Sequence, residues 1–340
     1  MTSIAIVCPG YPHRPGGVRD HTERLRDHWR ESGIAIEVVG DLDTDPRALA
    51  ARWSARGVGA ALIEYVPFLY GPRGVSTYPE RLARSARSHG IRVIVFVHEP
   101  WVPLTRLPWL VLGPLQRVQL RRLAAQSATV VTAVPAWQAM LGEQTELVYV
   151  GSNLGEVPPG AERAPSLPSP VVFSVTAAGL NLEWIVGAER AIGASPGLIL
   201  VGTDAAEARG HATIGRWFDP SWDYRGRLPA PEVLRALACA PLVLAPFVDG
   251  ATGRRGSLLA ALSAGARVIS SRGPLMDPVF EQSPVTLAGS REQFVTAARR
   301  SWAAADSPAE RARRRAWYHL HFDARALDER LLRIVLGTGR

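Results

Sequence analysis

The chain has 340 residues, 47% of them hydrophobic and 21% charged, which is the composition of a globular protein and excludes a disordered or fibrous chain. At this length two domains are expected, each long enough to bury its own core. The net charge at pH 7 is +8, from 39 basic and 31 acidic residues, and every basic residue is arginine. We interpret this charge as the dispersed basic surface of a protein from a G+C-rich genome. Attraction to anionic lipids or phosphorylated substrates is the alternative.

The first half of the chain alternates short strands with helices. Apolar runs rich in Val and Ile predict strands at Ile4–Cys8, Ile34–Val39, Ala60–Ile63, Val93–Val97 and Thr129–Thr132. A 3.6-residue apolar period predicts helices at Val18–Glu31, Tyr78–His89 and Leu115–Ala125. Strands separated by helices form parallel sheets covered on both faces, so we expect an α/β domain over residues 1–156.

Residues 157–170 read VPPGAERAPSLPSP, and this absence of periodicity predicts a linker. The alternation then restarts, with strands predicted at Val171–Val175, Leu198–Val201, Leu242–Ala245 and Arg267–Ser270. Helices are predicted at Leu182–Ile192, Pro231–Cys239, Ser257–Ser263, Arg291–Ala304, Pro308–Trp317 and Ala324–Leu336. The sequence therefore predicts a second α/β domain from residue 171.

The cysteines and the hydropathy pattern bear on the location of the protein. Cys8 and Cys239 are too few for a disulfide framework or for a zinc site of paired spacing, which favours a reducing, cytoplasmic compartment. No apolar run reaches 18 residues, the nearest being Pro108–Leu115, so no transmembrane span is expected. The first apolar run lacks a basic segment before it and ends at Pro9, which is typical of a buried strand and not of a signal peptide.

A glycine turn follows the first predicted strand. Gly16 and Gly17 directly precede the helix at Val18. Glycines at such a turn let the backbone approach a bulky anion, which also meets the free N–H groups of the helix. The spacing is not GxGxxG, so a dinucleotide fingerprint is absent, and an ordinary tight turn is the alternative to a ligand contact.

His98 and Glu99 come at the end of the strand predicted at Val93–Val97 and are followed by Pro100 and Trp101. Residues just beyond the carboxyl ends of strands line the ligand crevice of an open parallel sheet. This position favours contact between His98 and a substrate, with a purely structural histidine as the alternative.

The most informative segment is the strand, loop and helix over residues 245–265. Its loop holds Asp249 and two adjacent arginines, Arg254 and Arg255, and a helix begins near Gly256. Two guanidiniums beside a helix N-terminus attract the same anion through charge-assisted hydrogen bonds, free N–H groups and the helix dipole. The segment therefore predicts a diphosphate site, with exposed loop arginines as the alternative.

Five segments, in this order along nearly the whole chain, resemble the family 4 glycosyltransferases of the GT-B fold. They are Tyr65-Val66-Pro67-Phe68, His98-Glu99-Pro100-Trp101, Val150-Gly151-Ser152-Asn153, Tyr224-Arg225-Gly226-Arg227-Leu228, and Pro246-Phe247-Val248-Asp249-Gly250 followed by Arg254-Arg255-Gly256-Ser257-Leu258. The resemblance implies an α/β fold with two Rossmann-like domains facing across a cleft. It also implies an acceptor held by the first domain, a donor held by residues 171–320, and a last segment, 321–340, that crosses back to the first domain.

The resemblance also implies roles for individual residues. The nucleotide-sugar donor would be bound by Gly16, Gly17, Arg227, Leu228, Asp249, Gly250, Gly256, Ser257 and Leu258. His98 would hydrogen-bond the transferred sugar, and Arg254 and Arg255 would stabilise the diphosphate leaving group in place of a metal, so neither a metal nor a cofactor is expected. Asp20, His21 and Glu99 would lie on the acceptor side, although a solvated helix face is the alternative for Asp20 and His21.

The chain departs from the family pattern where the nucleotide binds. Many relatives carry two glutamates eight positions apart, and the alignment places Thr252 and Ala260 there. The segment 177–181 lacks the basic residue that commonly meets the donor phosphates. Asp249 could replace the first carboxylate, and the two loop arginines could replace the basic residue.

The expected activity is sugar transfer, with retention at the anomeric carbon, from a nucleoside diphosphate sugar to a hydroxyl-bearing acceptor that is a saccharide, a lipid-linked molecule or a small molecule. A GT-B sugar epimerase or pseudo-glycosyl coupling enzyme and a catalytically silent nucleotide-binding partner are the alternatives. No nucleic-acid partner is expected, because no basic stripe interleaved with aromatics is found. The apolar segment Trp101–Leu115 could dock the protein on the inner membrane face, with buried packing between domains as the alternative.

Overall fold

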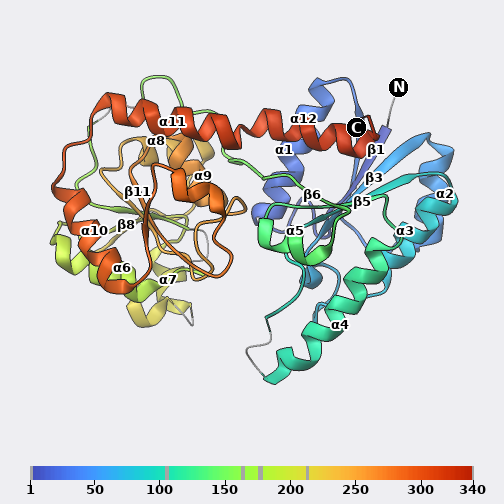
Figure 1. The fold of residues 1–340 in the computed structure, drawn as a ribbon, viewed down its shortest axis with the longest axis horizontal. Coiled ribbons are helices and arrows are strands. Elements are labelled where there is room, and N and C mark those ends of the chain that lie inside the picture. Colours follow the sequence, from blue (N-terminus) through green and yellow to red (C-terminus); the bar gives the residue numbers. More distant parts are fainter. Residues whose placement is uncertain (1–2, 104–106, 162–164, 175–178, 212–213, 339–340) are drawn as a thin grey trace. The chain divides into compact units, whose positions relative to one another are not determined.

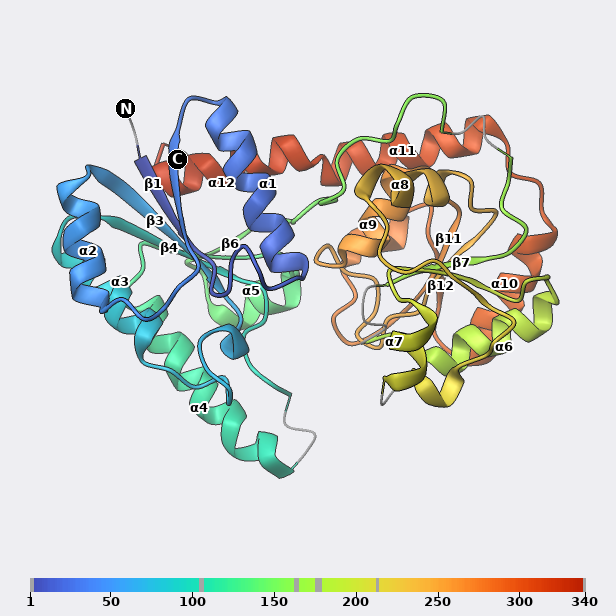
Figure 2. The ribbon, with the colours of Figure 1, turned by 180° about the vertical axis from the view of Figure 1, so that it is seen from behind.

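The computed structural model describes residues 3–103, 107–161, 165–174, 179–211 and 214–338. The chain divides into two compact units (Figures 1 and 2). Unit 1 comprises Met1–Val150 together with Ala324–Arg340, and unit 2 comprises Gly151–Asp323. Each unit has its own parallel β-sheet.

Unit 1 contains a six-stranded parallel sheet with the strand order β2-β1-β3-β4-β5-β6. Its strands are β1 (Ser3–Val7), β2 (Ala35–Val39), β3 (Val58–Tyr65), β4 (Arg92–Val97), β5 (Thr129–Thr132) and β6 (Thr145–Leu147). Its helices are α1 (Gly17–Glu31), α2 (Pro46–Ala55), the 3-10 helix η1 (Pro67–Leu69), α3 (Tyr78–Ser88), α4 (Leu107–Ala124), α5 (Pro135–Leu141) and α12 (Ala324–Leu336). Helices connect most consecutive strands, as parallel pairing requires.

The central strands of unit 1 are apolar because both faces of the sheet are covered. Val7 and Val95 are fully buried and share one core with Leu49 and Trp53 of α2 and Leu82 of α3. A strand that is buried on both faces reads as a continuous apolar run and not as an alternating one, which explains the runs of Val, Ile and Ala in this half of the sequence.

Helix α12 is held on α1 by a buried ion pair. Asp328 of α12 is 2% exposed and accepts hydrogen bonds from Nε of Arg24 at 2.9 Å and from its Nη2 at 2.7 Å. Nδ1 of His28 lies 2.6 Å from the same carboxylate, and the indole N–H of Trp29 donates to the backbone oxygen of Asp328 at 3.0 Å. Polar contacts between residues about 300 positions apart therefore tie the last helix to the first.

Unit 2 contains a second six-stranded parallel sheet, with the strand order β12-β11-β10-β7-β8-β9. Its strands are β7 (Val171–Phe173), β8 (Ile199–Val201), β9 (Asp223–Tyr224), β10 (Val243–Ala245), β11 (Val268–Ser271) and β12 (Thr286–Ala288). Its helices are α6 (Leu182–Ile192), α7 (Ala205–Gly210), the 3-10 helix η3 (Gly215–Trp217), α8 (Ala230–Ala238), α9 (Gly256–Ser263), the 3-10 helix η4 (Pro278–Gln282), α10 (Arg291–Ala303) and α11 (Pro308–Phe322). The parallel α/β fold class predicted from the sequence is thus confirmed.

Each sheet has a point where the order of strands reverses. In unit 1, β2 lies on one side of β1 and β3 on the other, and in unit 2, β8 lies on one side of β7 and β10 on the other. Ligands of open α/β sheets bind outside the carboxyl ends of the strands at such a switch point. The loops after β1 and β3, and after β7 and β10, are therefore the candidate ligand-binding positions of the two units.

The predicted helices and strands are present, most with small shifts at their ends. Val175, the end of the strand predicted at Val171–Val175, lies outside the described residues. Helix α11 continues to Phe322, five residues beyond the predicted end at Trp317, and helix α2 was not predicted. Helix α4 begins at Leu107, whereas the sequence predicted its start at Leu115, and Pro114 lies inside the helix. Proline is unfavourable in a helix interior, which is why the pattern favoured the later start. Short elements such as α5 and β9 had no periodic signal long enough to predict them. Residues 157–161 and 165–170 hold no α-helix or strand and belong to unit 2.

Candidate functional site

The switch point of unit 2 is formed by two loops that are hydrogen-bonded to each other. The N–H of Asn181, after β7, donates to the backbone oxygen of Pro246, after β10, at 2.7 Å. The N–H of Val248 donates back to the oxygen of Gly179 at 2.8 Å. The predicted arginine loop therefore leaves the sheet at the position where ligands of open α/β sheets bind.

Asp249, Arg254 and Arg255 form one ionic cluster at this switch point. Nη2 of Arg254 donates to Oδ2 of Asp249 at 2.5 Å, and Nη2 of Arg255 donates to Oδ1 of the same carboxylate. The guanidinium of Arg255 also lies over the ring of Phe247, 4.7 Å from its centroid. The two arginine side chains are 20% and 19% exposed, so they are held within the structure and do not extend into bulk solvent. Both guanidiniums thus bind the same carboxylate of Asp249 and lie side by side at the carboxyl end of β10.

Helix α9 begins directly after the two arginines. Arg255 is its N-cap and provides no side-chain capping hydrogen bond. The first N–H groups of a helix have no partner within the helix, so the N–H groups of Gly256, Ser257 and Leu258 are placed where an anion could bind. Gly256 and Ser257 are partly exposed, whereas the side chain of Leu258 is fully buried, so only its backbone could contact a ligand.

Gly250 has a structural reason to be glycine. Its φ is +93°, and a Cβ there would lie 2.7 Å from the backbone nitrogen of Gly273. The loop of Asp249 is therefore held against the loop after β11 by a close backbone approach that needs no ligand.

Arg227 and Leu228 lie away from the arginine loop. They follow β9, the edge strand that β8 separates from β7. Arg227 is exposed and pairs with Glu207 at 3.4 Å. The backbone of Gly226 is tied to the loop after β8, because its N–H donates to Thr203 and its oxygen accepts from Gly202. The ion pair of Arg227 is thus to α7, and the backbone contacts of the preceding Gly226 are to the loop after β8.

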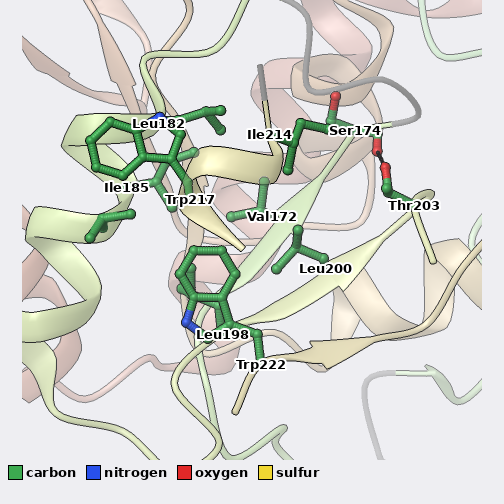
Figure 3. Close-up of a pocket in the computed structure, with 11 residues that line it drawn as sticks. Val172, Ser174, Leu182, Ile185, Leu198, Leu200, Thr203, Ile214, Trp217 and Trp222 are labelled. Carbon is green, nitrogen blue, oxygen red and sulfur yellow. Dashed lines mark hydrogen bonds between the residues drawn. The ribbon is translucent and has the colours of Figure 1, made fainter. Parts of the chain in front are cut away.

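A small cavity of about 20 Å³ lies beneath α6 in unit 2 (Figure 3). Apolar side chains of β7, β8 and α6 line it, together with Trp217 and Trp222, and the hydroxyl of Thr203 donates to the oxygen of Ser174 at one end. This volume holds about one water molecule, so the cavity is too small for a nucleotide.

In unit 1 the glycine turn after β1 is open to solvent. Gly16 and Gly17 are exposed, and a Cβ at either residue would meet no atom within 4 Å, so there is open space beside this turn. Gly16 has φ +147° and is the N-cap of α1, which begins at Gly17. An open hollow of about 540 Å³ borders this turn and is lined by Gly10, Tyr11, His13, Arg14, Gly40 and Asp41.

The residues predicted on the acceptor side have different surroundings. Asp20 is partly exposed and pairs with its neighbour Arg19 at 2.5 Å. Glu99 is exposed after β4. His21 is only 2% exposed, so the interpretation of this helix face as solvated is wrong for His21.

His21, His98 and Glu64 form a buried trio beside the switch point of unit 1. Nε2 of His98 lies 2.5 Å from Oε2 of Glu64, and Nδ1 of His21 lies 3.3 Å from Oε1. The rings of His21 and His98 both contact Phe96, with centroids 5.0 and 4.6 Å away. Burial by itself raises the pKa of Glu64, but the two imidazoles outweigh it and lower this pKa to about 2, so the carboxylate is ionised. Burial lowers the pKa of His21.

The trio has the donor types of a metal site. Two imidazoles and one carboxylate offer ligand atoms that all lie within 4.8 Å of one another. Ligand atoms of a tetrahedral zinc ion are roughly 3.3 Å apart, because each lies about 2.0 to 2.2 Å from the metal. The 2.5 Å separation between Nε2 of His98 and Oε2 of Glu64 is that of a direct hydrogen bond, so a cation would require the carboxylate to turn away from His98.

Glu64 was missed by the sequence interpretation, which identified His21 and His98 but predicted the strand only as an apolar run ending at Ile63. Its signal was one carboxylate in an otherwise apolar strand, VGAALIEY. Such a residue almost never lies fully buried unless it is paired. The positions of its partners, 43 and 34 residues away, are set only by the parallel register of the sheet and the packing of α1.

Comparison with known proteins identifies the fold. No family model and no curated protein sequence matches the chain. Among solved structures, sucrose-phosphate synthase from Thermosynechococcus elongatus has 14% identity and a TM-score of 0.74, with both chains fully covered. Anabaena HepE in complex with UDP and glucose has 14% identity and a TM-score of 0.67, covering 99% of this chain and 100% of HepE. A putative UDP-N-acetylglucosamine 2-epimerase from Listeria monocytogenes has 10% identity and a TM-score of 0.58, covering 97% and 94%.

These similarities establish the fold class expected from the sequence. The chain has the GT-B fold of glycosyltransferases such as the first two proteins. The low identities limit this finding to the fold, and an activity has to be argued from the site itself.

Proposed function

We propose that this protein is a glycosyltransferase that moves a sugar from a nucleoside diphosphate sugar to a hydroxyl group of an acceptor. The observation that carries the proposal is the cluster of Asp249, Arg254 and Arg255 at the switch point of unit 2, directly before α9. The structural neighbour HepE was solved with UDP and glucose, which supports a diphosphate ligand for the same fold.

The chemistry of the cluster suits the departure of a diphosphate. The barrier in sugar transfer lies in expelling the diphosphate while positive charge develops on the sugar. A guanidinium has five N–H donors, so Arg254 and Arg255 can each bind Asp249 and a phosphate oxygen together. With the N–H groups at the start of α9, they would stabilise the negative charge on the leaving group without a metal ion. We further propose that transfer retains the anomeric configuration, as in the family 4 enzymes that the sequence resembles.

The acceptor and the transferred sugar would meet unit 1. Gly16 and Gly17 offer an exposed backbone, and His98, 12% exposed, is the member of the buried trio nearest to solvent. In this proposal His98 hydrogen-bonds the transferred sugar, whereas Asp20 and Glu99 contact the acceptor.

Replacing both Arg254 and Arg255 with alanine tests the proposal. We expect transfer to be abolished and nucleoside diphosphate binding to weaken, since one preorganised donor can be worth about 3 to 4 kcal/mol. Arg300→Ala is a matched control, because Arg300 is an exposed arginine in the last turn of α10 in the same unit. Activity would be followed with a panel of UDP-, GDP-, dTDP- and ADP-sugars, and binding by calorimetry. Full activity in the double variant would refute the proposed site.

An epimerase is the second candidate, because one structural neighbour is a putative UDP-N-acetylglucosamine 2-epimerase with the same fold. Conversion of a sugar nucleotide without an acceptor would favour this candidate. Nucleotide binding without turnover on any acceptor would favour a silent partner of another enzyme.

We also propose that the protein is cytoplasmic and binds peripherally to a membrane through one face of α4. Its side chains are exposed at 83% for Leu107, 65% for Val111, 47% for Leu115 and 44% for Val118, which follow one another at helical spacing. Residues 104–106 of the predicted docking segment lie outside the described residues. Both ribbon views show the start of α4 projecting away from the sheet of its own unit (Figures 1 and 2).

Charge favours an anionic bilayer as the partner of this face. Residues 100–142 contain no aspartate or glutamate, and α4 ends in the exposed Arg121 and Arg122. An apolar face next to arginines is the pattern of interfacial helices on anionic lipids. Among the described residues no helix combines the length and the apolar character needed to cross a bilayer.

Vesicle flotation tests this contact. The protein should float with vesicles that contain phosphatidylglycerol, and Val111→Glu with Leu115→Glu should remove that binding. Leu320→Glu is the matched control, because Leu320 is a 78% exposed leucine on α11 in the other unit. Flotation of the double variant equal to that of the unaltered chain would refute membrane docking at this face. So would a dimer of the unaltered chain in solution that the double variant disrupts.

A further inference from the structure

Glu64 is a carboxylate whose position stability alone does not explain. It is 0% exposed on the central strand β3, between the buried Ile63 and Tyr65. Its ion-pair partners within the described residues are the imidazoles of His21 and His98. Apolar replacements of buried ion pairs are often neutral or stabilising, so such a network is weak evidence for a contribution to stability. An effect of Glu64 on the proton or orientation of one of the two histidines therefore explains its position better than a contribution to stability.

His98 is the histidine that such a role would serve. Its side chain is 12% exposed, compared with 2% for His21. Its ring stacks on Phe96 at an interplanar angle of 26°, and its backbone N–H donates to the oxygen of Tyr65 at 3.0 Å. These contacts fix the plane of the ring and its backbone, but they leave open which ring nitrogen carries the proton.

The contact with Glu64 decides the position of that proton. An ionised carboxylate can only accept hydrogen bonds, so Nε2 of His98 donates to Glu64. When the ring carries a single proton, Nδ1 is therefore left as an acceptor. The two nitrogens point in different directions, so Nδ1 is directed away from Glu64. Buried carboxylates fix the tautomer of a histidine in the same way in hydrolase triads.

We infer that Glu64 is a positioning residue that holds the Nε2–H tautomer of His98 and thereby presents Nδ1 as the acceptor for a hydroxyl group of the sugar. This inference rests on the proposed function, since it requires His98 to meet a sugar. The second oxygen of Glu64 lies 3.3 Å from Nδ1 of His21, a residue of α1.

¹⁵N NMR of the full chain with labelled histidine tests the inference without any turnover. At a pH where the ring is neutral, the signals of His98, assigned with His98→Asn, should show a protonated Nε2 and an unprotonated Nδ1. Glu64→Gln, whose amide oxygen can still accept, should keep this tautomer, whereas Glu64→Leu should give a mixture. A protonated Nδ1 or a mixture in the unaltered chain would overturn the inference, whether or not the variants fold.

Kinetics and metal addition complete the test. In an active enzyme, Glu64→Leu should lower kcat by about 10-fold or more with a small change in the KM of the donor, and Glu64→Gln should recover most of the loss. Glu31→Gln, at an exposed glutamate of α1, is the matched control and should leave kcat unchanged.

Zinc that shifts the signals of His21 and His98 together would overturn the inference in favour of a metal site. A fixed tautomer without turnover on any donor would count against the proposed transferase and not against the action of Glu64 on His98.

Discussion

Replacing Asp328 with alanine should release α12 from α1. The side chain of Asp328 is 3% exposed and accepts two hydrogen bonds from Arg24, whose own side chain is 8% exposed, and it also pairs with His28. Removing one partner of a buried ion pair costs about 3 to 5 kcal/mol, because the other charge stays buried without compensation. The indole bond of Trp29 survives, since it is made to the backbone.

Native-state hydrogen exchange measures this loss within unit 1. A cost of about 3 kcal/mol or more lowers the protection of the α12 amides by more than about 100-fold, and amides of α10 in unit 2 serve as the internal reference. Glu329→Ala is the matched control on the same helix, because Glu329 is 57% exposed and should cost less than about 1 kcal/mol. Arg24→Met combined with Asp328→Leu should recover most of the stability, as no charge is left unpaired. If the double variant is as unstable as Asp328→Ala, or if the single variant keeps full protection, the reasoning is wrong.

The acid sensitivity of this contact has a definite sign. Burial by itself raises the pKa of Asp328, but His28 and Arg24 outweigh it, so the pKa lies below its usual value. A carboxyl group with a lowered folded pKa stabilises the protein above its unfolded pKa, which is about 4, and this stabilisation is lost as the pH falls through the folded pKa.

The remaining predictions follow from pH and from single backbone or capping contacts. The protection of α12 should fall on acidification below about pH 4 in the unaltered chain, and a chain carrying Asp328→Ala should lack that part of the fall. Gly250→Ala should destabilise unit 2 by more than the ~1 to 2 kcal/mol expected from positive φ alone, because its Cβ would meet the backbone of Gly273. Gly193→Ala, with φ +65° and open space around the Cβ, is the control in a urea titration. Equal losses of stability in the two variants would contradict the close approach of Gly250 to Gly273. Ser307→Ala should cost about 1 kcal/mol in the same titration, because Ser307 and Glu310 form a capping box at the start of α11, and an unchanged midpoint would contradict this role.

Some features of the site were determined by the sequence alone. Alternation of apolar runs with helical patterns is a local property, so it predicted a parallel α/β chain and the order of its elements. The carboxyl ends of parallel strands share one edge of the sheet, so the loop of Arg254 and Arg255 could be assigned to a ligand-binding edge before any packing was known.

The tertiary structure decided which side chains meet. Asp249 is bound by both loop arginines, Glu64 lies between two histidines from other elements, and the last helix pairs with Arg24 through Asp328. The sequence could not determine these pairings, because the cost of burying a charge depends on what packs around it, and the partners come from distant parts of the chain. Local patterns therefore determine the helices and strands and their order. The ionic contacts of Asp249 and the protonation of Glu64 and its histidines depend on contacts that exist only after the sheets have formed.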